Sequence, residues 1–251
     1  MKKMSFCRQI IMISLLLITL ASGMPFAQQP RIGEAARIGF PMPDFTLPSI
    51  QGETISLSQY RGKNVLLLFP RGRFRNQWCR FCHYQYVELV ELEKTLGIRE
   101  KYNLEILQVL PYTKAEVEDW VKDFKRNLGE IEAWKNPPNP ENLGTQAKAW
   151  METSRKTWPK KFDYSEDDVP LLFPILIDAD RKVSIGLELF RTEWNLNRAE
   201  QNIPTVFIID EDGILRLKYM SQTTMDRPTF DFILKFIDRM IIDYKREFLS
   251  G

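Results

Sequence analysis

The residues best suited to chemistry are Cys79 and Cys82, which are separated by two residues in the stretch Trp-Cys-Arg-Phe-Cys-His at 78–83. A disulfide across so short a loop would contribute only about 2 kcal/mol through chain entropy, so it would be a poor structural cross-link. A redox-active dithiol is one interpretation of the pair. The letters C-x-x-C-H also match the attachment pattern of c-type haem, in which His83 would be the axial ligand.

The first 27 residues have the pattern of a secretory signal peptide. Three basic residues accompany an apolar run of 11 residues at 10–20, and small residues follow it. Eleven apolar residues are about half of what a helix needs to span a bilayer. We therefore expect cleavage after Gly23 or Ala27 and a secreted or periplasmic protein. Membrane attachment would follow only if the segment stayed uncleaved.

Removal of residues 1–27 would also remove Cys7, so the mature chain would carry two cysteines, Cys79 and Cys82. Export would place this pair in an oxidising compartment, where a C-x-x-C dithiol can cycle. The same removal leaves 32 basic against 33 acidic residues, a net charge of −1. Such a balance gives no support to nucleic-acid binding or to a polybasic membrane patch.

After a polar linker at 28–37, residues 38–251 are predicted to form one α/β domain. A turn at Gln51-Gly52 predicts an N-terminal hairpin, and a second turn at 210–213 predicts another. Apolar runs and helical spacings then place the remaining elements. Strands are expected at 45–47, 64–69, 104–110, 173–177, 205–209 and 214–220, and helices at 82–96, 114–124, 183–190 and 230–248. Strands that alternate with helices predict a three-layer fold.

One segment, from about 126 to 170, interrupts this alternation. It holds a Pro-rich turn, many charges, and the tryptophans Trp134, Trp150 and Trp158. We expect an insertion with one or two helices. Its tryptophans either form a local core or hold a partner, and the second possibility would make the chain a binding module built on this α/β domain.

The position of Cys79 favours a reactive thiolate. It lies where the strand at 64–69 gives way to a helix, and the dipole of a helix N-terminus lowers the pKa of a thiol. Cys82, one helical turn later, is placed to resolve a mixed disulfide formed at Cys79. Nearby cations either lower the pKa of Cys79 further or belong to a solvated loop. These cations are Arg71, Arg73, Arg75 and Arg80.

Several blocks of sequence, in a specific order and spacing, resemble one known family. They are Gly-Phe-Pro-Met-Pro-Asp-Phe-Thr-Leu at 39–47, Ser-Leu-Ser-Gln-Tyr-Arg-Gly-Lys at 56–63, residues 65–72 leading into 78–82, residues 173–178, and residues 203–210. The chain resembles the alkyl hydroperoxide reductase/thiol-specific antioxidant (peroxiredoxin) and redoxin branch of the thioredoxin fold. The resemblance covers most of residues 38–245 outside the insertion, and it implies a thioredoxin-like fold.

By this resemblance Cys79 is the nucleophile and Cys82 is the resolving thiol. The redox-active disulfide is then the only redox group, with no metal and no bound cofactor. The expected partners are a protein thiol or disulfide, or a thioredoxin-like electron donor, with peroxide as an alternative substrate. The residues expected to support the site are Trp78, Arg80, Pro204 and Thr205.

The chain also departs from the family pattern. Typical peroxiredoxins carry Thr or Ser three residues before the peroxidatic cysteine, where this chain has Asn76, and an arginine where it has Pro204. Pro204 resembles instead the cis-proline that packs beside the disulfide of thioredoxin-like proteins, and Arg198 is the candidate replacement for the arginine. These departures favour thiol–disulfide exchange over peroxide reduction, with haem attachment as a remote alternative.

Overall fold

The computed structural model describes residues 36–164 and 168–250. The predicted signal peptide, and all but the last two residues of the predicted linker, lie outside these residues. So does residue 7, the third cysteine.

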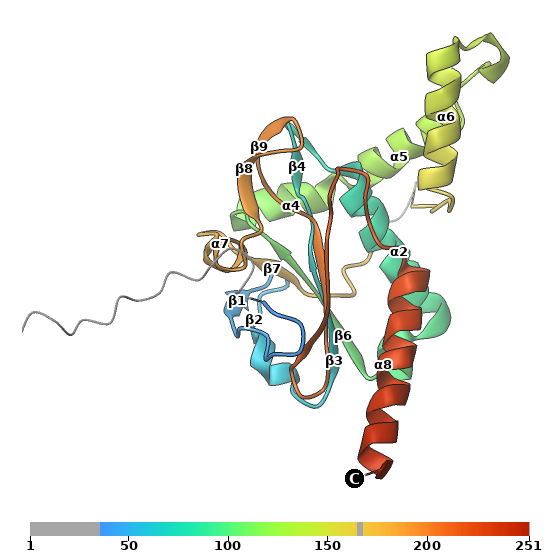
Figure 1. Cartoon of the computed structure of the whole chain (residues 1–251). Helices are drawn as coiled ribbons and strands as arrows, with labels where there is room; N and C mark the ends of the chain where they lie inside the picture. Colours follow the sequence, from blue (N-terminus) through green and yellow to red (C-terminus); the bar gives the residue numbers. More distant parts are fainter. Residues whose placement is uncertain (1–35, 165–167, 251) are drawn as a thin grey trace, which may run out of the picture. The chain divides into compact units, whose positions relative to one another are not determined.

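A five-stranded mixed sheet forms the centre of the domain (Figure 1). Its strands, in spatial order, are β11 (Leu215–Met220), β10 (Thr205–Ile209), β3 (Asn64–Phe69), β6 (Leu104–Leu110) and β7 (Ile175–Ile177). β3, β6 and β7 are parallel, whereas β10 runs antiparallel to both of its neighbours. All six residues of β3 are buried, as a continuous apolar run in the middle of a covered sheet requires.

Helices cover one face of this sheet. They are α2 (Arg80–Leu96), α3 (Ile98–Lys101), α4 (Lys114–Lys122) and α8 (Phe230–Ser250). On this face Leu66 and Leu68 of β3 share a core with Val87 of α2 and Ile233 of α8. The neighbouring residues of β3 point the other way, because side chains alternate across a strand.

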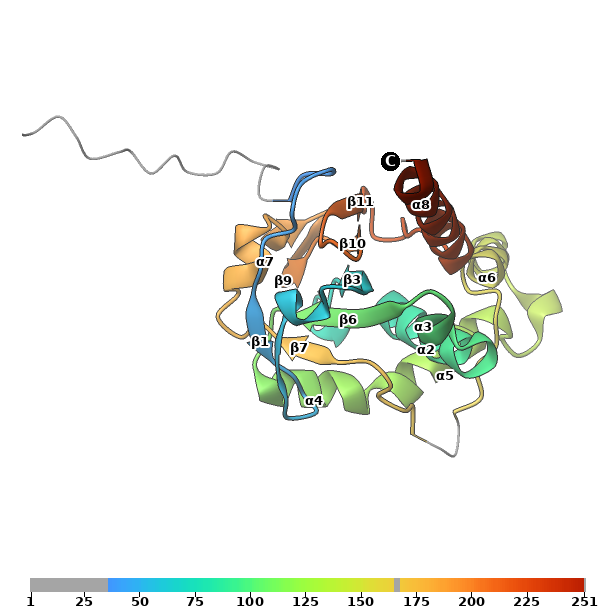
Figure 2. The ribbon, with the colours of Figure 1, turned by 90° about the horizontal axis from the view of Figure 1, so that it is seen from below.

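The opposite face is covered by the N-terminal hairpin and one short helix (Figure 2). These elements are β1 (Thr46–Pro48), β2 (Thr54–Ser56), the 3₁₀ helix η1 (Leu57–Tyr60) and α7 (Lys182–Gly186). Leu67 of β3 packs here with Ile55 and Leu187. The predicted three-layer α/β fold with an N-terminal hairpin is therefore confirmed.

The predicted insertion consists mainly of two helices, α5 (Phe124–Lys135) and α6 (Thr145–Thr157), joined through the 3₁₀ turn η2 (Pro140–Asn142). α5 packs against both α2 and α6. In Figure 1, α6 lies beyond the end of α5, well away from the sheet. The insertion contacts the rest of the domain through α5 and through the segment after α6, where Lys160 pairs with Glu88 of α2 (2.8 Å).

Two short hairpins were not expected from the sequence. The helix predicted at 183–190 ends at Gly186, and Phe190 instead begins β8 (Phe190–Trp194), which pairs with β9 (Asn197–Asn202). The second hairpin joins β4 (Arg73–Phe74) to β5 (Gln77–Trp78). Polar residues dominate both hairpins, so neither shows the alternation that marks a half-buried strand.

Within the described ranges, none of the helices combines the length and the apolar composition needed to cross a bilayer.

Candidate active site

A tight loop carries the chain from the end of β3 to Cys79. Gly72 in this loop has a φ of +79°, and a Cβ there would lie 2.3 Å from the ring of Tyr112. Only glycine fits both the backbone conformation and the space. The carbonyl of Gly72 accepts a hydrogen bond from the N–H of Cys79 (2.7 Å). Cys79 is thereby fixed at the N-cap of α2, where the sequence predicted it.

Tyr112 and Trp78 brace this loop. The Tyr112 hydroxyl accepts a hydrogen bond from the N–H of Arg73 (2.9 Å) and donates one to the carbonyl of Glu200 (2.8 Å). Trp78 meets Tyr112 edge to face, with ring centroids 5.1 Å apart, and its indole N–H donates to Asp119 (2.8 Å). Trp78 therefore supports the site by anchoring the residue before the first cysteine.

The two cysteines are free thiols that differ strongly in acidity. The Cys82 thiol donates a hydrogen bond to the Cys79 sulfur, and this bond is the main reason why the pKa of Cys79 falls from 9.0 to about 5. The charges of Arg227 and Arg71 lower it further, while burial opposes them. Burial and the neighbouring Cys79 raise the pKa of Cys82 well above 9.0. At neutral pH the pair therefore holds one proton, on Cys82, and one negative charge, on Cys79.

Two guanidinium groups face this thiolate, and only one of them was predicted. Arg71 is 3% exposed, and its Nε donates to Gln201 (2.8 Å). Arg227, in the loop before α8, donates from Nη1 to the carbonyl of Asp226 (2.7 Å). Nη2 of Arg71, and Nε and Nη2 of Arg227, are buried without a hydrogen-bond partner. The charges of both groups therefore act on Cys79, and these N–H groups retain unused hydrogen-bonding capacity.

Two of the other predicted cations, Arg80 and Arg73, form ion pairs with carboxylates. Arg80 forms an ion pair with Glu130 and donates to Gln77 (3.0 Å). Arg73 pairs with Glu116 (3.2 Å). Arg80 therefore supports the site differently from the expectation, because it ties the first turn of α2 to α5.

Pro204 and Thr205 lie beside Cys82, where they line a small cavity of about 20 Å³ with it. The register pairs Thr205 with Phe69, which brings the start of β10 to the end of β3. The Thr205 hydroxyl donates to the carbonyl of Ile203 (3.0 Å). The expected cis bond before Pro204 is wrong, because the described residues contain no cis peptide. The Pro204 carbonyl accepts from the N–H of Ser221 (2.9 Å), which extends the β10–β11 ladder by one residue.

The two residues suggested by the family comparison lie elsewhere. Asn76 is exposed in the turn between β4 and β5. The side chain of Arg198, on β9, is 85% exposed and pairs with Glu193. Arg198 therefore does not replace the missing arginine, and Arg71 and Arg227 supply the positive charge instead. No local pattern marks Arg227, because it is separated from Cys79 by more than half of the domain.

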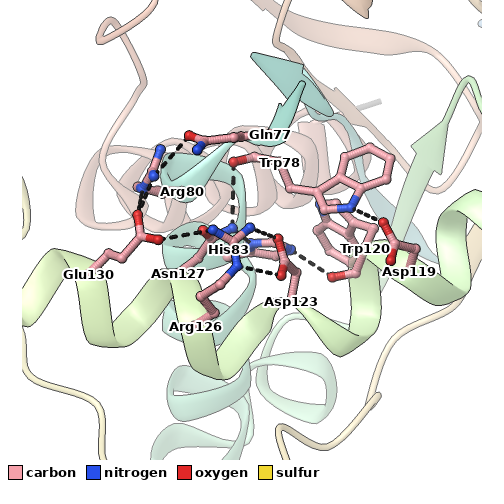
Figure 3. A network of polar contacts seen from close by, with 10 residues as sticks. All are labelled: Gln77, Trp78, Arg80, His83, Asp119, Trp120, Asp123, Arg126, Asn127 and Glu130. Carbon is pink, nitrogen blue, oxygen red and sulfur yellow. Dashed lines mark hydrogen bonds and ion pairs between the residues drawn. The ribbon is translucent and has the colours of Figure 1, made fainter. Parts of the chain in front are cut away.

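A buried polar network joins the first turn of α2 to α4 and α5 (Figure 3). His83 is fully buried; its Nδ1 accepts from Asn127 (2.5 Å) and its Nε2 donates to the carbonyl of Trp120 (2.9 Å). Arg126 links Asp123 to Glu130 in the same network. The network holds the helix that carries both cysteines.

His83 does not fit the role of a haem ligand. Both of its ring nitrogens have protein partners, and its ring packs against those of Trp120 and Phe124, with centroids 4.6 and 4.4 Å away. Burial lowers its pKa from 6.5 to about 3, so the imidazole is neutral. In the described part of the chain no group of three or more His, Cys, Asp or Glu side chains is placed to hold a metal ion.

The acidity of Cys79 can be tested in a Cys7→Ser background, in which only the active-site thiols react. We expect the rate of alkylation by iodoacetamide to reach half of its maximum near pH 5. Cys82→Ala should raise this midpoint, because it removes the hydrogen-bond donor, and Arg227→Met should raise it through the lost charge. Arg80→Met is the matched control and should leave it unchanged. A wild-type midpoint near that of free cysteine, about pH 8.5, would contradict this account.

The burial of neutral His83 should make stability depend on pH. Its pKa is about 3 in the folded protein and about 6.5 in an unfolded chain, so the unfolded state binds more protons between these values. Stability therefore falls as the pH decreases, and His83 alone should cost about 2 kcal/mol between pH 7 and pH 5. His83→Phe should be less stable at pH 7, because Asn127 and Trp120 lose a partner, but should lose less stability on acidification. Urea denaturation at pH 7, 6 and 5 measures the free energy of unfolding of the wild type and of His83→Phe. An equal loss of this free energy on acidification in the two proteins would refute the prediction.

Comparison with known proteins places this site in a family. The AhpC/TSA family model matches residues 38–218. A cysteine-to-serine mutant of the peroxiredoxin 6 of Arenicola marina has a similar structure, with 17% identity, a TM-score of 0.55, and coverage of 83% of this chain and 74% of that one. The reduced 2-Cys peroxiredoxin of Plasmodium vivax is similar at 18% identity and a TM-score of 0.50, with 83% of each chain covered. These likenesses show a thioredoxin-like fold, and no curated protein matches the chain. Since the family model spans most of its length, the chain belongs to the AhpC/TSA family.

Proposed function

We propose that this protein is a thiol–disulfide oxidoreductase that works through Cys79 and Cys82. The observation that carries the proposal is the difference in acidity between two sulfurs one helical turn apart. Cys79 is a thiolate at neutral pH, while Cys82 keeps its proton. The thiolate is the nucleophile in disulfide exchange, so the pair supplies an attacking group and a reserve thiol. Membership of the AhpC/TSA family supports thiol-dependent redox chemistry in general.

The exchange runs in two displacements. The Cys79 thiolate attacks one sulfur of a substrate disulfide, a Cys79–substrate disulfide forms, and the other substrate sulfur leaves with the electron pair and takes a proton. Cys82 then loses its proton, attacks the Cys79 sulfur and releases the second substrate thiol. The substrate gains two electrons, and the Cys79–Cys82 pair becomes a disulfide. The reverse sequence oxidises a substrate dithiol.

The low pKa of Cys79 bears on the direction of this exchange. A stabilised thiolate favours the reduced pair and makes Cys79 a good leaving group, so the disulfide form is the better oxidant. We therefore place the reduction potential between those of thioredoxin, about −270 mV, and of DsbA, about −120 mV. A protein dithiol, or a thioredoxin-like protein, is the proposed partner.

Peroxide reduction is the second candidate, and the unpartnered N–H groups of Arg71 and Arg227 favour it. They could donate to peroxide oxygens while the Cys79 thiolate attacks. The O–O bond would break, Cys79 would become a sulfenic acid, and water or an alcohol would leave with the proton. Cys82 would then condense with the sulfenic acid, releasing water and forming the disulfide. A thiol donor would return the pair to the reduced state.

We also propose export, supported by the signal-like pattern of residues 1–27. The pair would then operate in a secreted or periplasmic setting. N-terminal sequencing of protein recovered from outside the cytoplasm should find residue 24 or 28 first, and an intact N-terminus would contradict this.

One set of rate measurements separates the two reactions. Reduced wild-type protein should reduce insulin disulfides, and Cys79→Ser should lose at least about 10³-fold of that rate, because the nucleophile is gone. Cys82→Ser should instead accumulate a mixed disulfide that is visible by mass spectrometry. The same protein should react with hydrogen peroxide no faster than free cysteine.

Two outcomes would overturn this assignment. Unchanged insulin reduction by Cys79→Ser would exclude exchange through this site. A fast peroxide reaction, reduced more than the insulin reaction by Arg71→Met or Arg227→Met, would assign the protein to the second candidate.

A further inference from the structure

An aromatic cleft of about 310 Å³ opens beside the nucleophilic sulfur. Cys79 lies at one side of it, and three tryptophans of the insertion, Trp134, Trp150 and Trp158, form much of the wall. Their ring centroids are 5.5 to 6.3 Å apart, so they make one continuous surface. Phe81, between the two cysteines, meets Trp158 edge to face at 5.8 Å. The insertion and the active site therefore share one cleft.

The wall consists of aromatic rings, and arginines stack on three of the rings that line the cleft. Arg227 lies 5.2 Å from the centre of the Phe81 ring, Arg71 lies 4.9 Å from that of Phe74, and Arg80 lies 4.9 Å from that of Trp134. The charge of Arg80 is offset by the ion pair with Glu130, so the tryptophan part of the wall carries little net charge. Trp158 is 2% exposed and forms the base of the wall, whereas Trp150 is 42% exposed and reaches solvent. An exposed indole beside a nucleophile is a strong candidate for ligand contact, because Trp is enriched among residues that dominate binding.

One residue that lines the cleft has a buried polar atom without a hydrogen-bond partner. It is Arg71, which is 3% exposed and has a buried Nη2 that makes no hydrogen bond. Leaving a buried donor unsatisfied is unfavourable, so an acceptor placed within reach of it is favoured. The ligand that complements this cleft is therefore a large apolar group with a hydrogen-bond acceptor close to it.

We propose that this cleft binds a large apolar side chain that flanks the reacting cysteine of a polypeptide substrate, and that Trp150 and Trp134 determine this preference. A polypeptide offers an apolar side chain and a main-chain carbonyl within one residue, which complements the tryptophan wall and the Arg71 donor together. The volume is at the low end of the 300–1,000 Å³ typical of ligand pockets, so it suits one side chain rather than a whole cofactor. This inference rests on the proposed disulfide exchange and names its substrate class.

The test uses short peptides that differ only in the residues on both sides of one cysteine, which are Leu, Trp or Ser. Each cysteine is presented as a mixed disulfide with 2-mercaptoethanol, so the leaving group carries no ring. Mass spectrometry follows consumption by the reduced wild-type protein. We expect the Leu and Trp peptides to react about tenfold faster than the Ser peptide.

Trp150→Ala should lower this ratio about tenfold, whereas Trp150→Phe should retain most of it. Phe232→Ala is the matched control, because Phe232 is similarly exposed (46%) but lies on α8. It should leave the ratio unchanged.

Three results would overturn the inference. They are equal rates for all peptides with the wild type, an equal loss with every peptide in Trp150→Ala, and a Trp150-dependent preference for an aryl hydroperoxide over the peptides. Failure of the wild type to react with bis(2-hydroxyethyl) disulfide would be a different result, because it would refute disulfide exchange itself.

Discussion

The negative charge on the buried Cys79 sulfur is the constraint on which the site depends. Transferring an ion from water into a protein costs several kcal/mol unless other groups compensate. Here the largest compensation is one hydrogen bond from Cys82, and the charges of Arg227 and Arg71 add to it. The hydrogen bonds from the thiol and the backbone N–H of Cys82 both come from the helix that begins after Cys79. The two arginines lie in loops, one before this helix and one far along the chain, and their charges stabilise the Cys79 thiolate further.

This requirement explains why Asn197 and Gln201 are buried in a hairpin whose other residues are mostly exposed or half-buried. Arg71 is held by Gln201 of β9, which in turn accepts a hydrogen bond from Asn197 (3.1 Å). Trp194 of β8 lies 5.6 Å from the Arg71 guanidinium. Asn197 and Gln201 are almost completely buried although they are polar, because they pair with each other and with the cation. The hairpin β8–β9 is thus a support for Arg71, and its stability and the acidity of Cys79 depend on the same contacts.

The sequence could predict the elements that have a local pattern of their own, but it could not predict the contacts that form only in the tertiary fold. The strands at 64–69 and 104–110 were predicted to the residue, because apolar runs buried on both faces carry their own signal. β8–β9 was missed, since its buried residues are placed by their contacts with Arg71 and follow no alternating pattern in the sequence. Arg227 was missed for a related reason: it meets the site only through the tertiary fold. The cis form of Pro204 was implied by the family resemblance, and the described residues contain no cis peptide.

The insertion affects the electrostatic environment of the Cys79 thiolate as well as the shape of the site. Electrostatic attraction strengthens as the surrounding dielectric falls, so an apolar wall beside Cys79 strengthens the pull of Arg71 on its charge. A substrate side chain that filled the cleft would exclude water from the same region and strengthen this attraction again. Binding and reactivity would then be coupled, because a well-fitting side chain both orients the substrate sulfur and isolates the charge that attacks it. Hydrogen peroxide, with only two oxygen atoms to bind, would leave the tryptophan wall unfilled and gain nothing from it.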